Sequence, residues 1–146
     1  MMIDAEDLMI RKTIHVDVPV ERAFEVFTAG WSDWWPSETH SIEKGRAEID
    51  WRPGGVACEI VGDKRHEWAD VLEFDPPNEL RLRWRVNPEN PSTEVRVTFA
   101  AEGGGTVVEL VHSGWEQYAD DAQETFASYT EGWDAVLGHY LRYLNS

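Results

Sequence analysis

The segment 117–144 carries the sequence pattern that most constrains how this chain can fold. Its large apolar side chains recur at intervals of three or four residues, as they do along one face of an amphipathic helix. The face consists of Phe126, Tyr129, Trp133, Val136, Leu137, Tyr140 and Leu144. Burying side chains of this size contributes on the order of 10 kcal/mol before conformational entropy is subtracted. We therefore expect the remaining apolar surface of the chain to close on this helix.

The sequence before this helix alternates apolar and polar residues in short runs that are separated by turns. Residues 10–18 predict a first strand, and two short helices are expected before Pro36. About six strands follow, and 80–86 has the most regular alternation of them. The predicted inward face of the sheet consists of Ile49, Trp51, Cys58, Ile60, Trp68, Leu72, Phe74, Leu82, Trp84, Val97, Phe99, Val108 and Leu110.

Consecutive strands that are joined by short turns form an antiparallel meander. The sequence therefore predicts an α+β fold in which a curved antiparallel sheet of about six or seven strands wraps around the long C-terminal helix. We expect a single domain over residues 1–146, with its core at about 10–144.

The charge balance excludes several classes of partner. The chain has 13 Lys and Arg against 28 Asp and Glu, which gives a net charge of −15. This charge repels phosphate polyanions, so neither nucleic acid nor an anionic membrane is expected as the main partner. No apolar run is long enough for stable membrane insertion, and the acidic N-terminal segment does not have the pattern of a secretory signal. We expect a cytoplasmic location.

Several short motifs occur along the chain in a particular order. They are Trp34-Trp35-Pro36, Arg52-Pro53-Gly54-Gly55, Asp75-Pro76-Pro77, Gly104-Gly105-Thr106, Leu110-Val111-His112-Ser113-Gly114 and Gly132-Trp133. Together they resemble the SRPBCC superfamily of START-like, helix-grip folds. Within it, the pattern is most similar to the branch named for the C-terminal domain of the heat-shock-protein-90 ATPase activator.

This resemblance implies an apolar cavity between the sheet and the long helix. Members of the superfamily bind hydrophobic small molecules or lipids, so we expect this chain to bind a hydrophobic or aromatic small molecule reversibly. Two alternatives remain open. One is a cyclase- or isomerase-like acid–base enzyme, and the other is a co-chaperone-like protein that activates a heat-shock-protein ATPase.

Eight tryptophans in 146 residues predict an aromatic interior. The rings either fill a core or line a pocket, and pockets usually combine apolar walls with a few polar groups. The expected ligand-binding residues are Trp35, Trp51, Trp68, Trp84, His112, Tyr129 and Trp133. The segment 30–40 is expected to act as a lid, with Gly30 as its hinge.

Asp70 and His112 interrupt the predicted inward face and are the candidate catalytic residues. A carboxylate and an imidazole that share one pocket can act as acid and base on an enolisable substrate. Alternatively, each side chain satisfies a neighbouring polar group, or a β-bulge turns Asp70 outward.

Other sequence features exclude further chemistry. The five histidines lack the spacing of a metal site, and the glycine runs lack the pattern of a phosphate-binding loop, so no metal or other cofactor is expected. Arg81, Arg83 and Arg85 form a basic stripe that either binds an anion or pairs with acids such as Glu94 and Glu109 on neighbouring strands. Two valines that face outward, Val107 and Val111, suggest a possible homodimer contact.

Overall fold

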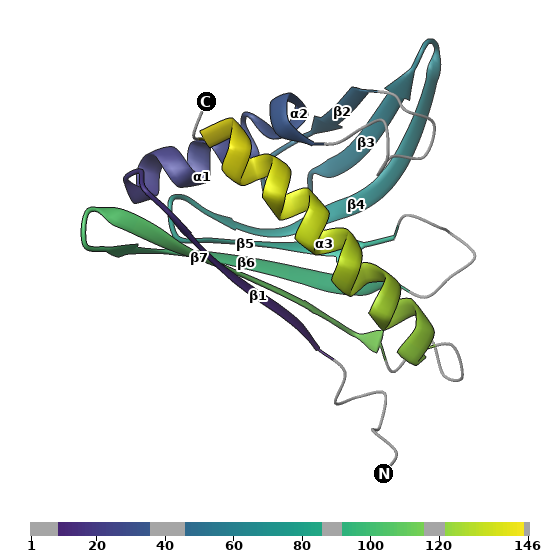
Figure 1. Ribbon diagram of the computed structural model, residues 1–146. Helices are drawn as coiled ribbons and strands as arrows, with labels where there is room; N and C mark the ends of the chain where they lie inside the picture. The colour runs from purple at the N-terminus through teal and green to yellow at the C-terminus, as the bar shows by residue number, and fades with distance from the viewer. Residues whose placement is uncertain (1–8, 36–45, 86–91, 116–121, 145–146) are drawn as a thin grey trace.

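The computed structural model describes residues 9–35, 46–85, 92–115 and 122–144, and it has the expected α+β architecture. The elements are β1 (Ile10–Val16), α1 (Val20–Thr28), α2 (Trp31–Trp34), β2 (Arg46–Ile49), β3 (Val56–Val61), β4 (Lys64–Asp75), β5 (Glu79–Trp84), β6 (Thr93–Glu102), β7 (Gly105–Ser113) and α3 (Ala122–Leu144). Figure 1 shows α3 crossing one face of the curved sheet, with α1 and α2 beside its C-terminal half. The predicted fold class is therefore confirmed.

The seven strands form one antiparallel sheet in the order β1-β7-β6-β5-β4-β3-β2. Strands β2 to β7 follow one another as a meander, because short turns can join antiparallel neighbours. The first strand breaks this order. It pairs with the last strand, with Ile14 opposite Val108, and therefore forms one edge of the sheet.

The apolar face predicted for α3 is the face that packs against the sheet. Trp133, Val136, Leu137 and Tyr140 are buried, and Tyr129 and Leu144 are partly buried. The Tyr140 hydroxyl donates a 2.6 Å hydrogen bond to the carbonyl oxygen of Ala23, which ties α3 to α1. The predicted start of this helix and the side chain of Phe126 lie outside the described residues.

Strand β4 departs from simple alternation at two places. Its register shifts against β3 between Ala57 and Cys58, and against β5 between Val71 and Glu73. Trp68 and Ala69 are consequently both buried, and Asp70 follows on the outer face, opposite Arg83. The prediction that Asp70 faces inward is therefore wrong, because a bulge changes which residues face the core.

The predicted orientation of β3 is also wrong. Ala57 belongs to the core, whereas Cys58 lies opposite Glu48 and Glu67, on the other face of the sheet. Ile60 shares the face of Cys58 because side chains alternate along a strand. The sequence Val-Ala-Cys-Glu-Ile-Val offers apolar residues to both faces, so its pattern does not fix the orientation.

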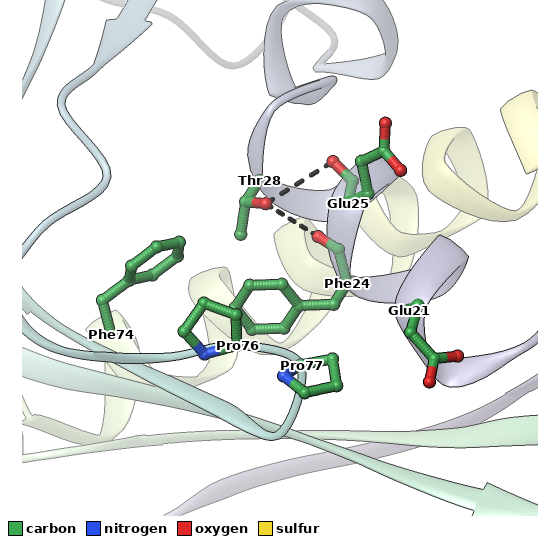
Figure 2. Close-up of a pocket in the computed structure, with 7 residues that line it drawn as sticks. All are labelled: Glu21, Phe24, Glu25, Thr28, Phe74, Pro76 and Pro77. Carbon is green, nitrogen blue, oxygen red and sulfur yellow. Dashed lines mark hydrogen bonds between the residues drawn. The ribbon is translucent and has the colours of Figure 1, made fainter.

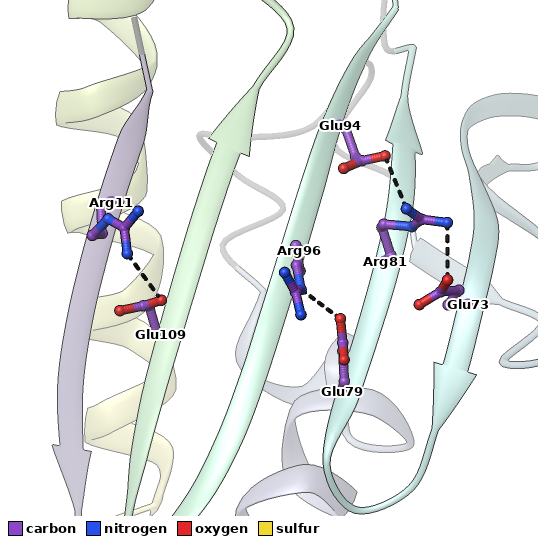
Figure 3. Close-up of polar contacts among 7 residues, drawn as sticks. All are labelled: Arg11, Glu73, Glu79, Arg81, Glu94, Arg96 and Glu109. Carbon is purple, nitrogen blue, oxygen red and sulfur yellow. Dashed lines mark hydrogen bonds and ion pairs between the residues drawn. The ribbon is translucent and has the colours of Figure 1, made fainter. Parts of the chain in front are cut away.

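The outer face of the sheet carries a network of ion pairs (Figure 3). Arg81 contacts both Glu73 and Glu94, while Arg96 contacts Glu79 on the neighbouring strand. The predicted pairing of Arg81 with Glu94 is thus confirmed, whereas Glu109 pairs with Arg11 instead. Cross-strand pairs of this kind stabilise a sheet modestly.

Candidate functional site

A continuous set of aromatic rings lies between the sheet and α3. We call this set the aromatic cluster, and its members are Trp31, Trp34, Trp35, Trp51, Trp68, Trp84, His112, Trp115, Tyr129 and Trp133. Every member has a ring neighbour in the cluster, with centroids 6.4 Å apart or less. The structure therefore brings together all seven residues that the sequence suggests as ligand-binding residues.

Three tryptophans form a stack near the end of α2. The centroid of the Trp35 ring lies 4.7 Å from that of Trp31, with 18° between the ring planes. It lies 6.0 Å from the centroid of Trp68, with 15° between the planes. Trp31 and Trp68 are buried, whereas Trp35 is only partly buried. The centroids of Trp31 and Trp68 are themselves 5.9 Å apart, so these two indoles contact each other and the Trp35 ring packs against both rather than lying between them.

The residues before Trp35 are held firmly in the core. The Trp34 indole N–H donates a 2.8 Å hydrogen bond to the carbonyl oxygen of Val26, and Trp31 and Trp34 are 3% and 4% exposed. A Cβ on Gly30 would lie 2.8 Å from the same oxygen, so the glycine permits a close backbone approach. The first part of the segment expected to act as a lid is therefore core, and residues 36–40 lie outside the described residues.

His112 connects the sheet to the long helix. Its Nδ1 accepts a 3.0 Å hydrogen bond from the Trp133 indole N–H, so the ring hydrogen resides on Nε2. Nε2 in turn lies 2.6 Å from the Thr93 hydroxyl oxygen, to which it donates. The side chain is 0% exposed, and burial lowers its pKa to about 3. His112 is therefore neutral at physiological pH, and both ring nitrogens are already engaged.

Two indole N–H groups in the cluster have no acceptor. Trp31 and Trp84 are 3% and 6% exposed, and the Nε1 of each lacks a hydrogen-bond partner in the described part of the chain. Burial raises the pKa of Tyr129, and the nearby Trp84 N–H partly opposes this rise. The Trp84 N–H and the Tyr129 hydroxyl nevertheless do not reach the geometry of a hydrogen bond. A buried donor without an acceptor costs about 1–3 kcal/mol. These two groups are the polar features of the cluster that its own packing leaves unexplained.

Asp70 and His112 do not share a pocket. The Asp70 carboxylate accepts two hydrogen bonds from Arg85, at 2.8 and 2.9 Å, on the outer face of the sheet. His112 instead lies in the aromatic cluster on the inner face. The expected acid–base pair is therefore absent, because the bulge in β4 places the carboxylate on the far side of the sheet.

Replacing Asp70 with asparagine is expected to lower the free energy of unfolding by about 1 kcal/mol at pH 7. The hydrogen bonds from Arg85 hold the pKa of Asp70 below its usual value of 3.8. The stabilisation that the Asp70–Arg85 pair provides is thus fully present above pH 3.8, and it is lost as the pH falls through the lower pKa that Asp70 has in the folded protein. Urea denaturation at pH 7 and in strong acid measures the difference, and Asp63→Asn, at an exposed turn, is the control. An equal loss at both pH values would contradict this assignment.

Sequence reasoning missed Thr93 and three members of the aromatic cluster, which are Trp31, Trp34 and Trp115. Thr93 begins β6, so extending the alternation of Val95, Val97 and Phe99 backwards places it on the inner face. Trp31 and Trp34 fall in the segment expected to act as a lid. Trp115 follows Gly114, beyond the last strand, where no alternation places it, yet its N–H donates to the carbonyl oxygen of His112.

The described residues contain no group of three or more His, Cys, Asp or Glu side chains arranged to hold a metal ion. Within the same residues, no helix has both the length and the apolar character needed to cross a membrane.

Comparisons with known proteins relate the chain to one family and to several solved structures. Residues 17–144 match the model of the family described as activator of Hsp90 ATPase homolog 1-like protein. CalU16 from Micromonospora echinospora has a similar structure, with a TM-score of 0.66 and 23% identity over 93% of this chain and 74% of that protein. No curated protein sequence matches the chain.

Two further structures have the same fold. DynU16, from the dynemicin biosynthetic locus, gives a TM-score of 0.70 and 20% identity over 96% of this chain, which spans 48% of that protein. The Aha1 dimer from Colwellia psychrerythraea gives a TM-score of 0.67 and 17% identity over 93% of this chain and 95% of that one. At these identities, the similarity establishes the fold.

Proposed function

Because the chain belongs to the activator of Hsp90 ATPase homolog 1-like family, we propose that it uses the interior of this fold to bind a small molecule. The ligand is a flat, apolar ring system that carries a hydrogen-bond acceptor such as a carbonyl oxygen. It binds within the aromatic cluster, beside Trp31, Trp68 and Trp84. The observation that carries this proposal is the pair of buried indole N–H groups that have no acceptor among the described residues.

The two N–H groups favour a ligand over a filled core. In a completed core, buried donors are almost always paired, because leaving one unpaired costs more than a hydrogen bond contributes. Trp31 and Trp84 both have ring contacts with Trp35 and Trp68, so the two donors border the same pair of rings. A ligand with an acceptor atom at this position satisfies at least one of them.

Trp35 provides the place for a flat ligand. Its partly buried ring stacks on Trp31 and on Trp68, as the ring of an aromatic ligand stacks on indoles. In the proposal the Trp35 ring moves outward and the ligand takes its position. Of the described residues in the segment predicted as a lid, only the Trp35 side chain moves in this proposal, whereas Trp31 and Trp34 stay in the core.

We expect fluorenone to bind about tenfold more tightly than fluorene, which has the same three-ring skeleton without the carbonyl group. Saturable quenching of tryptophan fluorescence measures both affinities. The preference for fluorenone is expected to disappear in the double variant Trp31→Phe, Trp84→Phe, which keeps aromatic rings but removes both donors. It persists in Trp115→Phe, whose N–H donates to the carbonyl oxygen of His112 in the native protein.

Three outcomes would contradict the proposal. Absence of saturable quenching by either compound, with the protein folded, would favour a filled core. Equal affinities for the two compounds would remove the proposed role of the indole donors. A preference for fluorenone that persists in the Trp31→Phe, Trp84→Phe variant would likewise show that the indole donors do not bind the carbonyl group.

The family name favours a second candidate function, which is binding to a chaperone ATPase. Such binding uses the outer surface of the domain, so it survives when a small molecule occupies the interior. A pull-down with a chaperone ATPase, with and without saturating fluorenone, separates the two functions. The homodimer suggested by Val107 and Val111 also stays a proposal, and the Aha1 dimer gives it weak support.

A further inference from the structure

A concave pocket lies on the surface, between α1 and the turn that joins β4 to β5. Figure 2 shows this pocket, which has a volume of about 380 Å³. It is lined by Glu21, Phe24, Glu25, Thr28, Phe74, Pro76 and Pro77. The volume is near the lower end of the range for small-molecule sites. No member of the aromatic cluster lines the pocket, although Trp51 of the cluster stacks on Phe74, and the pocket belongs to no function discussed so far.

The walls of this pocket are rigid and apolar. Phe24 packs on Phe74 and on Phe99, with ring centroids 5.4 and 5.0 Å apart, and only 4% of its surface is exposed. Pro76 and Pro77, from the turn that joins β4 to β5, also line the pocket. The Thr28 hydroxyl donates a 2.8 Å hydrogen bond to the Phe24 carbonyl oxygen, so its hydrogen is not available to a ligand. The pocket therefore favours an apolar body.

The charged groups at the pocket are both acidic. Glu21 and Glu25 are exposed on α1, and neither forms an ion pair with any residue that the structure describes. In Figure 2 the Glu21 carboxylate lies at the end of the pocket beside Pro77, whereas the Glu25 carboxylate points away. Charge complementarity thus selects a cationic occupant.

We propose that this pocket binds a small organic cation, an ammonium group carried on an apolar body. The apolar body packs between Phe24, Phe74 and the two prolines, and the ammonium group lies at the Glu21 end. Binding here does not depend on the interior site, so either proposal can fail without the other.

Trp51 provides a local reporter of occupancy. Its ring stacks on Phe74, with centroids 5.8 Å apart, and its N–H donates a 2.8 Å hydrogen bond to the Thr28 carbonyl oxygen. Both partners line the pocket. The indole N–H signal of Trp51 in a ¹H–¹⁵N spectrum is therefore expected to shift when the pocket fills.

The test compares 4-phenylbutylamine, 4-phenylbutanol and 4-phenylbutyrate, which share one apolar body and differ in charge. At low ionic strength we expect saturable shifts of the Trp51 signal, with the amine binding most tightly and the carboxylate least. Glu21→Gln is expected to weaken the amine about threefold to fivefold and to leave the alcohol unchanged. Glu25→Gln is expected to have a smaller effect.

The matched control is Glu131→Gln, which removes one negative charge from an exposed position on α3, away from the pocket. It is expected to leave the affinity for the amine unchanged. If Glu131→Gln weakens the amine as much as Glu21→Gln does, the attraction comes from the net charge and the proposal is wrong. Equal affinities of amine and alcohol in the native protein would also overturn it.

Discussion

Replacing His112 with alanine is expected to lower the free energy of unfolding by about 3–5 kcal/mol. The substitution leaves a cavity among the rings of the aromatic cluster. It also removes the acceptor of the Trp133 N–H and the donor to the Thr93 hydroxyl, in a region without solvent. Because His112 lies on β7 and Trp133 on α3, the loss weakens the contact between sheet and helix.

Urea denaturation between pH 7 and pH 4 measures this effect and tests its cause. Burial keeps the folded-state pKa of His112 near 3, below its usual value of 6.5. The unfolded chain therefore binds the proton first, and the native protein loses stability as the pH falls from about 6.5 toward 3. His112→Gln retains hydrogen-bonding capacity without this titration, so it is expected to show a weaker pH dependence. A loss below about 1 kcal/mol in His112→Ala would contradict the assigned role.

The second large effect is a difference in stability cost between replacing Trp133 and replacing Trp84 with phenylalanine, although the two side chains are similarly buried. Trp133→Phe is expected to cost about 2–4 kcal/mol, because it removes a buried hydrogen bond and leaves Nδ1 of His112 unpaired. Trp84→Phe is expected to cost about 1 kcal/mol or less, because removing an unpaired donor offsets the lost ring volume. The two residues are 3% and 6% exposed, so burial alone predicts equal costs.

Thermal and urea denaturation of the two variants, in the absence of ligand, test this contrast. Trp68→Phe serves as a reference for the loss of ring volume in the same cluster. Equal destabilisation of the Trp84 and Trp133 variants would show that Trp84 has an acceptor in the native protein. The argument for a ligand with a carbonyl group would then lose its support.

The parts of the fold that the sequence predicts are those where one face of an element is clearly apolar. The stripe of α3 and the alternation of β5 are such cases, and both have the predicted orientation. The bulges of β4 depend on how three strands pair, and no local pattern in the sequence specifies this pairing. For this reason the orientation of Asp70 could not be predicted, whereas that of Cys58 could not because β3 offers apolar residues to both faces.

The sequence likewise predicts one part of the candidate site and not the other. Composition and alternation place Trp51, Trp68 and Trp84 in one interior, and the ring contacts confirm that they belong to one cluster. Which indole N–H finds an acceptor depends on the positions of backbone carbonyls and of His112, and these positions follow only from the three-dimensional structure. The distinction between Trp84 and Trp133 is therefore invisible in the sequence.

The most direct test of the proposed function is a titration of the ¹⁵N-labelled protein with fluorenone, observed at the indole N–H signals. The account predicts that the signal of Trp84 or Trp31 moves downfield and saturates, because its N–H gains an acceptor. The signal of Trp115, whose N–H is already bonded, is expected to move less. If fluorene produces the same shifts as fluorenone, or if neither compound gives a saturable change, the interior does not bind a ligand through these donors and the proposal is wrong.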